Sequence, residues 1–134
     1  MITKSKRPRS LREVSNRTLK GGESFDRSLR EFLDFFYANP RQRHAALKAR
    51  PRPIDDLKDA YLAATAEHLA RSFALRVPAW SDNHGHRLKQ PFFAGGLESL
   101  KAILIVESPL AFRRRLLFVS KNALSRPRLP SEAA

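Results

Sequence analysis

Three successive arginines, Arg113, Arg114 and Arg115, are the strongest chemical feature of the sequence. An arginine guanidinium can bind a phosphate or a carboxylate through two parallel hydrogen bonds. Successive residues of a helix point about 100° apart, so the three side chains cannot all bind one ligand from one face. We therefore expect two of them to contact an anionic partner and at least one to pack or pair within the protein, where Glu107 is an available carboxylate.

Positive charge gathers at both ends of the 134-residue chain, whose formal net charge is +13. Residues 1–20 contain seven Lys or Arg against one acid, and residues 113–128 contain six against none, whereas the middle is nearly balanced. This asymmetry indicates a polyanionic or acidic partner. A solubilising role for the ends is the alternative. The residues expected to bind nucleic acid are Lys4, Lys6, Arg7, Arg9, Lys121, Arg126 and Arg128.

Aromatic residues in an irregular stretch, residues 75–96, form a second group of candidates. Proline and glycine interrupt any regular period there, and the stretch contains Trp80, Phe92 and Phe93. Exposed aromatic side chains can anchor a protein partner. They can equally hold a loop over the core of the protein, and both interpretations stay open from the sequence.

Catalytic and metal-binding patterns are absent from the sequence. The four histidines have no cysteines beside them and no helical partner spaced as in a zinc protease. No phosphate-binding loop, dinucleotide fingerprint or nucleophile elbow is present, since Gly95-Gly96 alone is too weak a signal. We therefore expect a non-enzymatic protein without a metal or a cofactor.

The spacing of apolar residues predicts helices. The clearest lies over 24–38, where Phe25, Leu29, Phe32, Leu33 and Phe36 share one face. Capping residues and prolines delimit the others, for example Ser10 with Glu13 at the first helix. Over 97–107 we favour a helix, although Ile103, Ile105 and Val106 would also suit a buried strand. The expected helices cover about 10–19, 24–38, 40–49, 54–74, 97–107 and 109–117.

These elements predict an all-α fold, a single compact bundle of five or six helices with flexible basic ends. We expect a basic arm over residues 1–9, a helical domain over 10–119 and a basic, proline-containing tail over 120–134. The length suffices for one core without disulfides or metals. There are no cysteines and no apolar run of roughly 20 residues, and the basic start lacks the apolar stretch of a signal peptide. A soluble cytoplasmic protein with no membrane contact is expected, of a monomeric or dimeric state that the sequence leaves open.

Several strings along the chain carry a resemblance to a known family. They are DAYLAA at 59–64, VPAW at 77–80, PFFAGGLESL at 91–100 and ESPLAFRRR at 107–115. With them, residues 10–128 resemble a family of small bacterial proteins that are encoded beside minimal nucleotidyltransferase-like toxins and are presumed antitoxins. Phe92 stands where the family pattern often has Trp, which keeps an aromatic residue at that position.

The resemblance implies an antitoxin-type protein that neutralises a cognate nucleotidyltransferase-like toxin by direct contact. Such a toxin binds nucleotide phosphates and metal through acidic residues, so basic side chains could block its pocket. Trp80, Phe92, Phe93 and Arg113 to Arg115 are then expected at or near the interface. Operator DNA is a second expected ligand. The alternative function is a nucleic-acid-binding regulatory protein that uses its basic ends.

Overall fold

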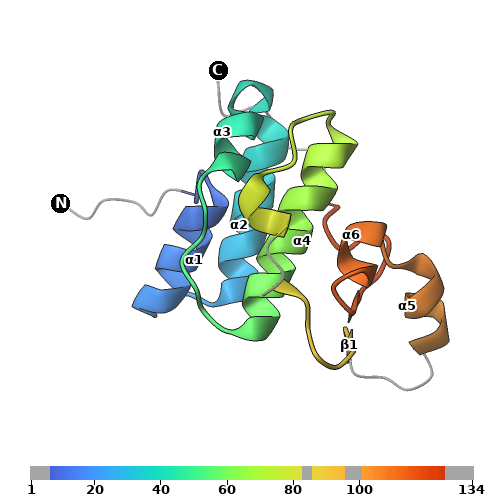
Figure 1. Ribbon diagram of the computed structural model, residues 1–134. Coiled ribbons are helices and arrows are strands. Elements are labelled where there is room, and N and C mark those ends of the chain that lie inside the picture. The colour runs from blue at the N-terminus through green and yellow to red at the C-terminus, as the bar shows by residue number, and fades with distance from the viewer. Residues whose placement is uncertain (1–6, 83–85, 96–100, 126–134) are drawn as a thin grey trace. The chain divides into compact units, whose positions relative to one another are not determined.

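The computed structural model describes residues 7–82, 86–95 and 101–125. The helices and the single pair of short strands found there confirm the predicted all-α class (Figure 1). Contacts divide the chain into two compact units, one containing the described residues up to Arg52 and the other formed by Pro53–Ser125. The α-helices of these described residues are α1 (Leu11–Lys20), α2 (Phe25–Ala38), α3 (Arg43–Lys48), α4 (Asp56–Ser72), α5 (Lys101–Glu107) and α6 (Leu110–Arg113).

In the first unit, α1 begins at the predicted cap. The Ser10 hydroxyl accepts a hydrogen bond from the Glu13 amide at 3.1 Å, while the Glu13 carboxylate accepts one from the Arg9 amide at 3.3 Å. The helix ends at Gly21, whose φ of 85° lies in the left-handed region that glycine adopts without strain.

The phenylalanine-rich helix α2 forms the core of this unit with α1, against which it packs. Phe32 and Phe36 are fully buried, and their ring centroids lie 5.9 Å apart. The helix agrees with the predicted range to within one residue. The segment predicted as a helix over 40–49 begins instead as a 3₁₀ turn, η1 (Pro40–Gln42), before α3 starts.

In the second unit, α4 is the longest helix and packs against the 3₁₀ turn η2 (Ala79–Asp82) and against α6. Asp55 caps its start, because the carboxylate accepts the Lys58 amide at 2.8 Å. Tyr61 of α4 meets Phe112 of α6 edge to face, with ring centroids 5.0 Å apart. This packing brings the arginines that follow Phe112 to the side of α4.

The predicted helix over 109–117 is wrong in its second half. The helix α6 stops at Arg113, and Leu116 adopts a left-handed φ of 63°. Residues Leu117–Phe118 then form a strand, β2, which pairs in parallel with β1 (Phe92–Phe93). Two-residue strands have no periodicity that a sequence could reveal, so this pairing was not predicted.

Two contacts fix α5 beside this strand pair. The Ser108 hydroxyl accepts the Val119 amide at 2.8 Å and donates to the Val119 carbonyl at 2.9 Å. Near the other end of α5, the Lys101 ammonium lies 5.1 Å from the centre of the Phe93 ring. The start of the predicted helix over 97–107 lies outside the described residues, but 101–107 is helical as expected.

Candidate partner-binding surface

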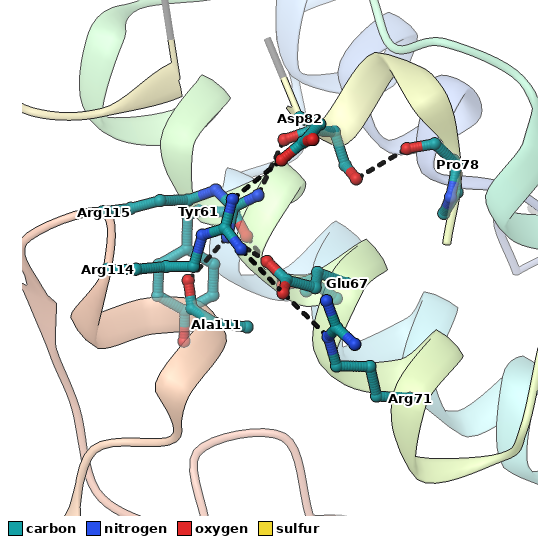
Figure 2. A network of polar contacts seen from close by, with 10 residues as sticks. Tyr61, Glu67, Arg71, Pro78, Asp82, Ala111, Arg114 and Arg115 are labelled. Carbon is teal, nitrogen blue, oxygen red and sulfur yellow. Dashed lines mark hydrogen bonds and ion pairs between the residues drawn. The ribbon is translucent and has the colours of Figure 1, made fainter. Parts of the chain in front are cut away.

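The three arginines lie at the end of α6 and in the turn after it, and they have different environments. Arg115 is buried, with 4% of its surface exposed, and its Nη1 lies 2.6 Å from Oε1 of Glu67 on α4. The same guanidinium donates to the carbonyls of Ala111 and Ser81, each at 2.7 Å. Figure 2 shows Arg114 and Arg115 both reaching toward Glu67. Arg115 therefore binds inside the protein and does not present its guanidinium to a partner.

Glu67 is the carboxylate that holds this cluster together. It is 2% exposed, and its Oε2 accepts Nε of Arg71 at 2.8 Å and Nη1 of Arg114 at 3.3 Å. Burial alone raises the pKa of Glu67, but hydrogen bonds from Arg115 and Arg71 and the charges of Arg115 and Arg114 outweigh it and lower the pKa. Glu67 thus stays ionised at neutral pH and neutralises the buried Arg115.

A structural partner for one arginine was predicted, but Glu67 was not the residue named. Glu107 was proposed because it lies close to the triplet in the sequence, whereas Glu67 lies 48 residues before Arg115. The sequence alone contained no signal that selects Glu67, and the structure supplies the reason for the pairing. Glu67 stands in a stretch of α4 whose neighbours Ala66 and Ala70 are fully buried, so its side chain needs a positive partner in the interior.

Arg113 and Arg114 remain at the surface. The Arg114 side chain is 43% exposed, and its Nη2 lies 2.7 Å from Oδ1 of Asp82, which is 71% exposed. Arg113 is exposed, and within the described part of the chain its side chain makes no hydrogen bond or ion pair. Two of the three arginines are thus exposed, but α6 ends at Arg113, so the helical spacing assumed from the sequence does not extend to Arg115. Their contact with a partner stays a prediction.

Exposed apolar side chains crowd the region around α5 and α6. Of the residues that the structure describes, six large apolar side chains are exposed, and five of these fall between residues 92 and 110. Within α5 the inward side is occupied by the buried Leu104. The five residues, which we call the apolar surface, are Phe92 (38% exposed), Ile103 (50%), Ile105 (46%), Val106 (77%) and Leu110 (61%).

The predicted aromatic anchors are only partly exposed. Phe93 is half-buried and stacks on Phe118 with ring centroids 4.9 Å apart, which fits the loop-holding alternative. Trp80 is half-buried in η2 and meets His86 edge to face. Phe92 is the exposed member of the three. The remaining four residues of the apolar surface were not candidates from the sequence, because apolar residues at helical spacing usually indicate a core.

No protein-family model, curated protein or solved structure matches this chain. In the described ranges, no group of three or more His, Cys, Asp or Glu side chains is placed to hold a metal ion. No helix among the same residues is long and apolar enough to cross a membrane.

The residues predicted to bind nucleic acid are only partly within the described ranges. Lys4, Lys6, Arg126 and Arg128 lie outside them. Arg9 is exposed, and its guanidinium carbon lies 5.8 Å from the centre of the Phe35 ring. Arg7 is half-buried, and Lys121 is exposed. Residues 7–9, the described part of the predicted arm, thus contact the first unit at Phe35 through Arg9, and Pro8 is buried.

Proposed function

We propose that this protein is a non-enzymatic binding protein of the antitoxin type, which neutralises a cognate nucleotidyltransferase-like toxin in the cytoplasm by direct contact. The apolar surface on β1, α5 and α6 is the observation that carries this proposal. Five large exposed apolar side chains fall within 19 residues of the chain, and apolar exposure of this kind can mark a site of association. The family resemblance of the sequence supplies the kind of partner.

Basic side chains stand beside the apolar surface. Leu110 precedes Arg113 by three residues and Arg114 by four, and side chains at these spacings are neighbours on a helix. A partner that covers Leu110 therefore meets two guanidinium groups. A nucleotidyltransferase-like toxin, which holds its metal and nucleotide through acidic residues, offers the complementary charge.

The test is co-expression with the product of the neighbouring gene, followed by co-purification at low and at high salt. A complex that survives high salt supports an apolar interface, because salt screens exposed charges and leaves apolar contacts intact. Absence of a complex at both salt concentrations contradicts the proposal.

Val106→Asp tests the surface itself. Burying valine contributes roughly 1.5 kcal/mol, of which the 77% exposure leaves about 1 kcal/mol to be gained from a partner. A carboxylate left unpaired in the interface costs a further 1–3 kcal/mol or so. The affinity of Val106→Asp for the co-expressed toxin should therefore fall by about 30-fold or more. Leu19→Asp is the matched control, because Leu19 is 43% exposed on α1 in the other unit, and its affinity should equal that of the wild type.

A second function is supported by the net charge of +13, which favours binding to nucleic acid. If the protein co-purifies with nucleic acid alone, and salt removes it, the basic ends carry the function. Binding to the operator DNA should then weaken steeply with salt, and binding that is absent or insensitive to salt contradicts this alternative.

A further inference from the structure

We propose that Arg114 binds a carboxylate of the protein partner, and that Asp82 occupies this arginine in the free protein. The inference rests on the proposed function, because it names the chemistry of the partner group that meets α6. It adds a specific residue and an internal competitor for it.

The two edges of the Arg114 guanidinium face different environments. Its Nη1 contacts Oε2 of the buried Glu67 at 3.3 Å, which anchors the group in the second unit. Its Nη2 contacts Asp82 at 2.7 Å, and the Asp82 side chain is 71% exposed. Figure 2 shows Asp82 and Glu67 approaching Arg114 from different elements, η2 and α4. One edge is therefore fixed, and the other is held by a side chain that faces solvent.

The outer contact is the exchangeable one. Ion pairs between exposed side chains are weak, because water solvates both charges and ordering two side chains costs entropy. A carboxylate from a partner can replace Asp82 with the same hydrogen-bond geometry and leave the contact with Glu67 in place. The planar guanidinium is suited to this exchange, since it binds carboxylates edge to edge.

Local charge favours an incoming anion. The ion-paired cluster around Glu67 contains two acids, Glu67 and Asp82. It contains three arginines, which are Arg71, Arg114 and Arg115. If Asp82 leaves Arg114, the outer side of the cluster is positive, and the neighbouring Arg113 adds a further exposed charge. Leu110 is exposed on the same short helix, so the anion is expected on a protein surface with apolar residues rather than on a nucleic-acid backbone.

Asp82→Asn is the decisive variant, because it removes the competitor without touching a buried group. The affinity for the co-expressed toxin, measured by isothermal titration calorimetry, should rise about two- to five-fold. Arg114→Gln should lower it by about five-fold or more. In the Arg114→Gln background, Asp82→Asn should give no gain. Asp56→Asn is the matched control for charge, since Asp56 is also an exposed aspartate but lies eleven residues from Glu67 along α4.

Unchanged or weaker binding of Asp82→Asn, or an equal gain from Asp56→Asn, would overturn the competition. A gain that persists without Arg114 would overturn it as well. These outcomes leave the proposed function standing if Val106→Asp still lowers the affinity for the toxin by about 30-fold or more.

A second probe separates the two proposals when no toxin complex forms. Polyglutamate is titrated into the full chain while the Nε–H signal of Arg114 is followed by nuclear magnetic resonance. A shift that is larger in Asp82→Asn supports the carboxylate site even if the toxin does not bind. No shift with polyglutamate, or a shift with an oligonucleotide alone, overturns the assignment of a carboxylate ligand.

Discussion

The buried pair of Glu67 and Arg115 predicts a specific pattern of stability in a double-mutant cycle. Glu67→Gln removes the charge that neutralises Arg115, a side chain with 4% of its surface exposed. Removing one member of a buried ion pair costs about 3–5 kcal/mol, because the other charge is left without compensation. That is a large share of the roughly 5–15 kcal/mol that stabilises a domain.

Arg115→Met should be about as costly for a different reason. It leaves the carbonyls of Ser81 and Ala111 without the donors that lie 2.7 Å away, and each unsatisfied buried group costs about 1–3 kcal/mol. Glu67 keeps Arg71 and Arg114 in this variant. In the double variant both charges are gone, so its loss should be close to that of either single variant. A coupling free energy of at least about 2 kcal/mol is expected.

Urea denaturation followed by tryptophan fluorescence measures this cycle. Trp80 is the single tryptophan of the sequence and directly precedes Ser81, whose carbonyl binds Arg115, so its emission reports on this part of the second unit. Arg113→Gln is the internal control and should change the free energy of unfolding by less than about 0.5 kcal/mol. Losses of Glu67→Gln and Arg115→Met that add in the double variant would refute the pairing.

Two other measurements test local features. Burial lowers the pKa of His68 below its ordinary value of 6.5, so the folded state favours the neutral ring and the free energy of unfolding should fall as the pH drops below 6.5. In melting temperatures recorded between about pH 5 and 7, His68→Gln should lack this fall. A pH profile of His68→Gln identical to that of the wild type would contradict the prediction. Asp55→Ala should lower the free energy of unfolding by about 1 kcal/mol in urea titrations, because Asp55 caps the start of α4. Asp55→Asn should lower it less, since Asn also caps helices. Equal losses in the two variants would argue against the cap.

Helices were predictable where a long apolar face and a capping residue coincide. The phenylalanine spacing identified α2, and Ser10 with Glu13 marked the start of α1. The prediction of a helix over 109–117 failed in its second half because Leu116 adopts a left-handed conformation, which is uncommon for leucine and has no signal in the sequence. The pairing of β1 with β2 depends on contacts between residues 25 positions apart, and local periodicity contains no information on them.

The sequence indicated which residues carry the charge of the site, but not which residues of the protein they contact. The three arginines were expected to differ because a helix would point them in different directions. The helix ends at Arg113 instead, and the turn after it leaves Arg115 buried, Arg114 shared between two acids and Arg113 exposed. Glu67 could not be chosen over Glu107 without the packing of α6 on α4. Ile103 and Val106 resemble core residues in sequence, and only the fold shows that Leu104 takes the inward side.

The unequal environments of the arginines also constrain how a chain of this kind can diverge. Position 113 can accept many residues, because its side chain is exposed. Position 115 has no such freedom while Glu67 is present, since lysine cannot reproduce donors to a carboxylate and two carbonyls in one plane. Positions 67 and 115 are therefore constrained together: a change at one removes most of what holds the other, whereas position 113 can change on its own.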